Sequence, residues 1–211
     1  KSKKEILFST NICHPSLANN EISGPVVAMK IAEFLRAKKR YYSYRIIFIP
    51  ETIGAIAFIK KRFLHLKNNL VAGFVLSCVG DDKQYSKISS RSGNTFADRV
   101  LEHTFKINKI KFKNYSFLAR GSDERQFCSP RVDLPVCTFL RTKFGNYKEY
   151  HTSNDNLNFI SARGLENSFK LIKSLIINIE NSDFYLALNP CEPFLTKYNL
   201  KKSLSGEKNL D

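Results

Sequence analysis

Residues 13–25 read CHPSLANNEISGP, and this stretch decides the fold prediction. It follows the apolar run at residues 6–12, which has the length of a buried strand. It leads into residues 23–35, where apolar side chains recur at helical spacing. A strand, a polar turn and a helix in this order are typical of open α/β sheets, which bind ligands beyond the carboxyl ends of their strands. The turn therefore predicts a functional site, with His14 standing where the strand ends.

Apolar runs of strand length alternate with helical patterns along the rest of the chain. Further strands are expected at residues 45–49, 71–79, 85–90, 116–120 and 135–140, with a basic connector at residues 109–115. Helices are expected at residues 23–35, 52–62, 95–105 and 161–179, with Ser23 and Ser161 as caps. This alternation predicts a mainly parallel sheet covered by helices on both faces. The polar connection at residues 142–158 is unusually long, which indicates a functional loop.

The 211 residues are enough for one sizeable α/β domain. We expect this domain at residues 1–180 and a C-terminal extension or linker at residues 181–211, where the periodicity is lost. Because the chain starts at Lys1 and enters a strand almost at once, we expect it to be a fragment of a longer protein. No apolar stretch has the roughly 18 residues of a membrane-spanning helix, so no membrane span is expected.

The cysteine pattern and the charge limit the function classes. Five scattered cysteines without a Cys-x-x-Cys pair argue against a disulfide framework and against a thiolate zinc site, and a cytoplasmic location is expected. The net charge of +15 fits either a polyanion partner or a lysine-rich composition spread over solvated faces. Because no nucleic-acid-binding motif is present, the second interpretation is favoured. The oligomeric state stays open.

Polar residues follow several of the predicted strands. His14, Glu51 and His151 each come after a strand, and Asp123 and Glu124 are a further candidate pair. In a parallel sheet these strand ends share one edge, so the side chains are expected to converge. Two imidazoles and an oxygen ligand make a zinc site with an open position for water, and a nearby glutamate can act as general base. The alternatives are hydrogen-bonded structural histidines and a helix-N-terminal charge at Glu51.

The motifs HP at residues 14–15, ANNEISG at 18–24, PETIG at 50–54, GSDE at 121–124 and YHTSND at 150–155 occur in this order. Together they resemble the zinc aminopeptidase family of bacterial leucyl aminopeptidase, glutaminyl cyclase and the transferrin-receptor ectodomain. They are more similar still to a bacterial branch described only as aminopeptidase-like, with a C-terminal winged-helix domain and frequent location in surface-polysaccharide gene clusters. The resemblance spans residues 6–179. It implies a three-layer α/β/α fold with a mixed, mostly parallel central sheet, as in zinc exopeptidases.

The resemblance also implies roles for individual residues. His14 matches the first metal ligand, Asn20 the metal-bridging position and His151 the last ligand, while Glu51 matches the general base. Thr52 stands where the family has a ligating glutamate. The surviving set is therefore expected to hold one zinc ion weakly, since an amide oxygen is a poorer zinc ligand than a carboxylate.

Other residues are expected to support this site. Ser77 stands near the position of a ligating aspartate, and Asp81 and Asp82 lie a few residues beyond it, out of register. Asp155 is expected to support the loop that carries His151, as a hydrogen-bonding or capping group. Substrate binding is expected from a charged cluster and a neighbouring tyrosine, namely Arg120, Asp123, Glu124, Arg125 and Tyr150.

Two function hypotheses follow. The first is a zinc-dependent aminopeptidase-like hydrolase that acts on a peptide or amide bond, with Glu51 activating metal-bound water. The alternative is a catalytically impaired module of the same fold with a binding role in surface-polysaccharide biosynthesis. A nucleic-acid partner is a third possibility that rests on charge alone.

Overall fold

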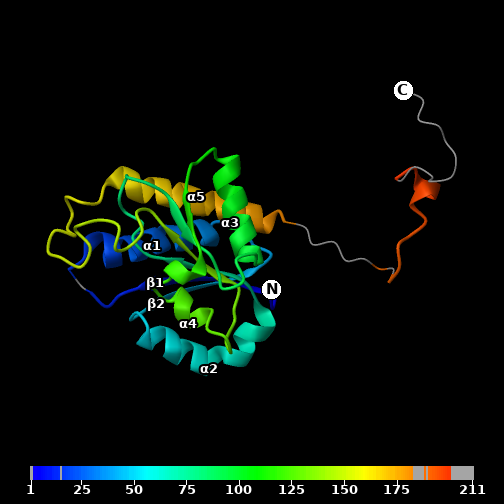
Figure 1. The fold of residues 1–211 in the computed structure, drawn as a ribbon, viewed down its shortest axis with the longest axis horizontal. Coiled ribbons are helices and arrows are strands. Elements are labelled where there is room, and N and C mark those ends of the chain that lie inside the picture. Colours follow the sequence, from blue (N-terminus) through cyan, green and yellow to red (C-terminus); the bar gives the residue numbers. More distant parts are fainter. Residues whose placement is uncertain (1, 15, 183–187, 189, 201–211) are drawn as a thin grey trace. The chain divides into compact units, whose positions relative to one another are not determined.

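The computed structural model describes residues 2–14, 16–182, 188 and 190–200. Contacts within the chain divide it into two units, Lys1–Asn181 and Ser182–Asp211. The first unit contains a six-stranded sheet between two layers of helices (Figure 1). In the second unit, the described residues include one short 3₁₀ turn, η3 (Leu195–Tyr198).

The sheet is mixed and mostly parallel, with the strand order β2-β1-β3-β6-β4-β5. Neighbouring strands are parallel from β2 to β6, β4 is antiparallel to β6, and β5 is parallel to β4. All seven residues of β1 are buried, as expected for a strand covered on both faces. The strands are β1 (Glu5–Asn11), β2 (Ser43–Ile49), β3 (Leu70–Leu76), β4 (Ser86–Ile88), β5 (Lys113–Tyr115) and β6 (Val136–Leu140).

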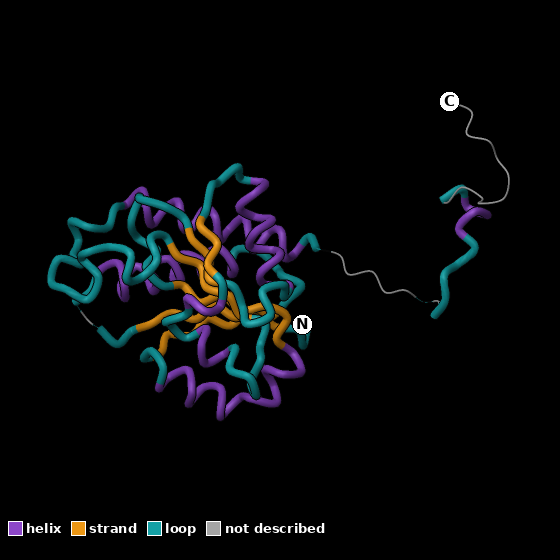
Figure 2. Tube along the Cα trace, in the orientation of Figure 1, coloured by secondary structure: helices purple, strands orange, loops and turns teal. Residues whose placement is uncertain are grey.

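Helices cover both faces of the sheet, as Figure 2 shows. The helices α1 (Ser23–Arg36), α3 (Phe96–Ile107) and α5 (Ala162–Glu180) share one hydrophobic core with the sheet. The helices α2 (Ile53–Asn69) and α4 (Glu124–Phe127) lie on the other core. Strand side chains alternate between the two, so Phe8 lies in the first core and Leu7 in the second. The predicted three-layer α/β/α architecture with a mixed, mostly parallel central sheet is confirmed.

The start of α1 differs from the prediction. A π-helical turn, η1 (Ala18–Ile22), precedes the helix, and the Ile22 N–H donates to the Leu17 carbonyl at 3.1 Å. The Ser23 hydroxyl does not cap α1, because it donates to the Asn19 carbonyl and accepts from the Val79 N–H. A side chain at Gly24 would clash with Thr10 Oγ1, so glycine lets the helix start close to β1. By contrast, Ser161 caps α5 as predicted.

The strand predicted at residues 116–120 is wrong. Residues Phe117–Ala119 form a 3₁₀ turn, η2. The strand in this region is β5, which ends at Tyr115, just before the predicted range. The backbone pairs explain this position, because the Lys113 N–H donates to the Tyr85 carbonyl and the Ser89 N–H donates to the Tyr115 carbonyl, both at 2.9 Å. Helix α2 is also longer than expected. Among the described residues, no helix is both long and apolar enough to span a membrane.

Candidate functional site

The segment after β1 and the long loop after β6 meet at the carboxyl edge of the sheet (Figure 1). The Ala18 N–H donates to the Asp155 carbonyl at 2.9 Å. The rings of His14 and His151 lie with their centroids 4.9 Å apart. The structure therefore brings together the two imidazoles that lie far apart in the sequence.

The Glu21 side chain contacts Cys13, His14 and Asn20 at this edge, a position that the sequence motifs do not predict. It is only 3% exposed. Its Oε1 lies 3.0 Å from His14 Nδ1, and its Oε2 accepts the Cys13 N–H at 2.9 Å. The Cys13 Sγ lies 3.4 Å from the same His14 nitrogen. Burial raises the pKa of the Cys13 thiol, and the neighbouring Glu21 and Glu51 carboxylates add to the effect.

The Asn20 amide lies between the carboxylate and the second imidazole. Its Nδ2 donates to Glu21 Oε1 at 3.1 Å and lies 3.4 Å from His151 Nε2. Its Oδ1 accepts from the Cys78 thiol at 3.6 Å. In this arrangement the amide directs N–H groups, which repel a cation, toward the two groups that would bind one. The predicted ligand set of His14, Asn20 and His151 is thus assembled, but its amide oxygen points elsewhere.

Asp155 ties the long loop to η1. Its carboxylate accepts the backbone N–H groups of Asn19 at 2.6 Å and Asn20 at 3.1 Å. These N–H groups open a helical turn and have no partner inside it, so Asp155 acts as a cap supplied from another segment. The cap positions the loop so that His151 faces Asn20.

Glu51 lies beside this cluster at the end of β2. Its side chain is half-buried, and its Oε1 accepts from the Asn11 amide at 3.0 Å. The Glu51 N–H donates to Cys13 Sγ at 3.3 Å, which places the glutamate next to the segment after β1. The same Asn11 amide donates to the Ser122 hydroxyl at 3.1 Å, so it bridges the ends of three segments.

Asp123 is fully buried next to Glu51. Its Oδ1 accepts the Thr52 N–H at 2.7 Å, and its buried Oδ2 has no hydrogen-bond partner within the described part of the chain. Burial raises the pKa of Asp123 to about 7; the Thr52 N–H opposes the shift, and the charges of Glu51 and Glu124 reinforce it. This carboxyl group is therefore partly protonated at neutral pH, when it can donate a hydrogen bond as well as accept one.

The remaining predicted substrate-binding residues do not form one charged cluster. Glu124 is fully buried and accepts from the Gly121 and Ser122 N–H groups and the Thr138 hydroxyl, so its position does not support a role in substrate binding. The Arg120 guanidinium lies over the Phe117 ring, and the exposed Arg125 donates to the Thr52 hydroxyl. Tyr150 stacks on His151 with ring centroids 4.0 Å apart.

Asp81 and Asp82 do not replace the missing metal ligands. Asp81 is fully buried and accepts from the Asn19 amide, the Lys83 N–H and the Thr142 N–H and hydroxyl. Asp82 accepts from the Ser161 hydroxyl and pairs with Arg163. Because both carboxylates are engaged in these bonds, neither supplies a metal ligand in place of Ser77 or Thr52.

Three non-glycine residues at this edge have left-handed backbone conformations. The φ angles are 64° for Thr52, 52° for Cys78 and 56° for His151. Each such backbone conformation lowers the stability of the fold by about 1–3 kcal/mol, and such conformations concentrate at functional sites. They follow β2 and β3 and lie in the loop after β6, so the strain gathers where the polar side chains meet.

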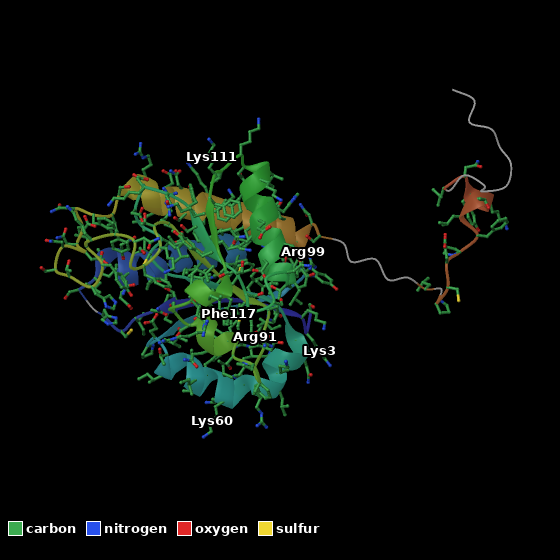
Figure 3. All side chains as sticks on the ribbon, in the orientation of Figure 1. Lys3, Lys60, Arg91, Arg99, Lys111 and Phe117 are labelled. Carbon is green, nitrogen blue, oxygen red and sulfur yellow. The ribbon has the colours of Figure 1, made fainter. Side chains whose placement is uncertain are left out.

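Basic side chains are spread over the first unit. Figure 3 shows Lys60, Arg91 and Lys111 extending from different elements of the fold. Arg91 is paired with Asp133. This distribution fits solvated faces better than a single polyanion-binding patch.

The sequence matches a family model described as a domain of unknown function, DUF4910, over residues 1–182. The chain belongs to this family. A Clostridium acetobutylicum protein provisionally named as a polysaccharide biosynthesis protein with an aminopeptidase-like domain is 39% identical over 207 residues, which cover 97% of this chain and 47% of that protein. The chain thus spans about half the length of this relative.

Solved structures share the fold. A crystal structure from Clostridium acetobutylicum, provisionally named a peptidase, has a TM-score of 0.82 at 39% identity and covers 92% of this chain and 46% of its own. A zinc aminopeptidase from Bacillus subtilis has a TM-score of 0.72 at 15% identity, covering 87% and 48%. A glutaminyl cyclase from an Acidobacteriales bacterium has a TM-score of 0.68 at 18% identity, covering 85% and 70%. The fold is therefore aminopeptidase-like.

Proposed function

We propose that this chain is an aminopeptidase-fold module that acts in surface-polysaccharide biosynthesis by binding a ligand, without the hydrolytic turnover of zinc aminopeptidases. The observation that carries the proposal is the position of the Asn20 amide between Glu21 and His151. An N–H₂ group there satisfies the carboxylate and the imidazole by hydrogen bonding. These side chains are therefore held together without a cation in the bridging position.

The donor set does not fit a two-metal centre. A second ion needs further carboxylates, but Thr52 and Ser77 stand at the corresponding positions, and Asp81 is held by structural bonds. The donors that are present, His14 and Glu21 among them, fit at most one ion of zinc-like chemistry. When bound, such an ion would polarise a carbonyl group and acidify water.

The carboxyl groups at this edge of the sheet favour a ligand that carries an amino group. Three carboxyl groups, Glu21, Glu51 and Asp123, gather at this edge of a chain whose net charge is +15. An ammonium group can compensate this local negative charge. The Tyr150 ring, stacked on His151, offers an apolar face at the same edge. The name of the Clostridium acetobutylicum relative supports a saccharide as the ligand class.

Matched ligands test the binding role. Titration calorimetry with a glucosamine oligosaccharide and its N-acetylated counterpart should give binding of the first and at least tenfold weaker binding of the second. Glu51→Gln should weaken binding, whereas Glu33→Gln on the exposed face of α1 should not. Equal binding of both saccharides, or binding of neither, would contradict the proposal.

The hydrolase remains a second candidate because of one contact. The Glu51 N–H donates to Cys13 Sγ, so a glutamate stands next to side chains that can bind metal. If the chain is a single-zinc hydrolase with Glu51 as general base, zinc-supplemented protein should cleave aminoacyl p-nitroanilides, and Glu51→Gln should abolish cleavage while Glu33→Gln leaves it intact. The binding proposal predicts no zinc-dependent cleavage by any of these proteins.

A further inference from the structure

We propose that Cys13, His14 and Glu21 form a binding site for one zinc-like divalent ion, with the thiolate, Nδ1 and a carboxylate oxygen as ligands. This set differs from the one that the sequence predicts, which contains no sulfur and uses Asn20 and His151. The inference goes beyond the proposed function and does not depend on it, since the metal can be measured without any saccharide or peptide.

The distances between the three donor atoms lie within about 0.3 Å of those around one tetrahedral ion. His14 Nδ1 lies 3.4 Å from Cys13 Sγ and 3.0 Å from Glu21 Oε1, and the sulfur lies 3.7 Å from that oxygen. With usual zinc–ligand bond lengths of about 2.0–2.3 Å, tetrahedral ligand pairs lie about 3.3–3.6 Å apart. Among the described residues, this group has its donor atoms within 4.8 Å of one another.

The surrounding contacts hold the ligands in place. The Cys13 N–H donates to Glu21 Oε2 at 2.9 Å, and the Glu51 N–H donates to Cys13 Sγ at 3.3 Å. Hydrogen bonds to metal ligands orient them and raise affinity. Because Glu21 is buried while the His14 side chain is 42% exposed, the site has an anchored side and a side open to solvent.

A catalytic triad is a poorer interpretation of the same three side chains. In a triad, the two imidazole nitrogens have different partners, the nucleophile on one and the carboxylate on the other. Here one nitrogen, His14 Nδ1, faces both Cys13 Sγ and Glu21 Oε1. Three donors that converge on one point suit a bound ion better than a proton relay.

The five scattered cysteines of the sequence argue against a zinc site built mainly from thiolates. A mixed site needs only one cysteine, and the π-helical turn η1 brings Glu21 back onto the residues that directly follow β1.

Cobalt titration of the metal-stripped chain tests the site, because cobalt replaces zinc and reports its ligands. We expect one cobalt ion per chain and a thiolate-to-cobalt charge-transfer band in the near ultraviolet. Cys13→Ser should remove the band and weaken binding at least tenfold. His151→Ala should keep the band, because its imidazole is not one of the three ligands, and the control His103→Ala, on the exposed face of α3, should change neither the band nor the affinity. A spectrum without the band that is lost in His151→Ala, or no cobalt binding at all, would overturn the proposal.

Alkylation of the unmodified sequence covers the case in which Cys13→Ser fails to fold. Zinc should protect Cys13 from iodoacetamide at least tenfold, as measured by peptide mass spectrometry. The exposed Cys191 provides the internal reference, and its rate should stay unchanged. Equal alkylation of Cys13 with and without zinc would overturn the proposal, whatever the result of the saccharide titrations.

Discussion

Two buried carboxyl groups of this molecule, Asp98 and Asp123, are treated in opposite ways. Asp98 at the start of α3 accepts from Lys87 Nζ, from Ser90 and from Thr95, and Lys87 itself is fully buried. Burial raises the pKa of Asp98, but the hydrogen bonds and the Lys87 charge outweigh it, so the net pKa lies below the usual value. Asp123, at the carboxyl edge of the sheet, accepts the Thr52 N–H, and burial raises its pKa to about 7.

Asp98 is a buried carboxylate that stabilises the fold, whereas Asp123 is a buried carboxyl group that can still gain or lose a proton. Around Asp98, every charge is compensated inside the fold, which fixes β4 against α3. At the carboxyl edge, Asp123 Oδ2 has no hydrogen-bond partner among the described residues, and Glu21 Oε1 accepts from the neutral Asn20 amide. Groups left undercompensated in this way can take a proton, a cation or a polar ligand, which is why the functional proposals concern that edge.

The largest expected effect is at Asp98. Replacing Asp98 by Asn leaves the buried Lys87 charge undercompensated, and it should lower the free energy of unfolding by about 3–5 kcal/mol. Urea denaturation measures this change. The control is Asp133→Asn, which removes an exposed pair with Arg91 and should cost less than about 1 kcal/mol. Equal losses for both variants would mean that burial does not distinguish the two pairs.

Asp155 gives an intermediate effect. It is fully buried, and Asp155→Ala leaves the N–H groups of Asn19 and Asn20 without their acceptor. We expect a loss of about 2 kcal/mol, since an unsatisfied buried donor costs about 1–3 kcal/mol. Hydrogen exchange should show faster exchange at Asn19 and Asn20, with little change in α3. Unchanged protection at both amides would show that Asp155 does not hold η1.

The third effect depends on pH. The folded pKa of Asp123 is about 7, above the unfolded value of about 3.9, so its contribution to stability is present at low pH and lost as pH rises toward 7. Asp123→Asn cannot titrate. The stability of the variant relative to the natural sequence should therefore increase by at least about 1 kcal/mol between about pH 4 and pH 8. A constant difference across this range would contradict a raised pKa.

The sequence contains enough information for the fold but only part of the site. Continuous apolar runs such as that in β3 identify buried parallel strands, because burial on both faces leaves no alternation. The convergence of His14 and His151 follows from strand order. The role of Glu21 was not predicted because η1 is π-helical. A turn with hydrogen bonds between residues five apart changes which side chains face His14. The three-residue strand β5 was missed because its pairing with β4 depends on distant backbone groups.

We propose that the Asn20 amide takes the place of a cation between Glu21 and His151. Thermal unfolding of Asn20→Asp, with and without zinc, tests this role. Without metal, the new carboxylate would face Glu21, so we predict a lower melting temperature than for the natural sequence. Zinc should then raise the melting temperature of Asn20→Asp more than that of the natural sequence. An Asn20→Asp protein that is as stable as the natural sequence without metal, and that gains no more from zinc, would contradict the claim.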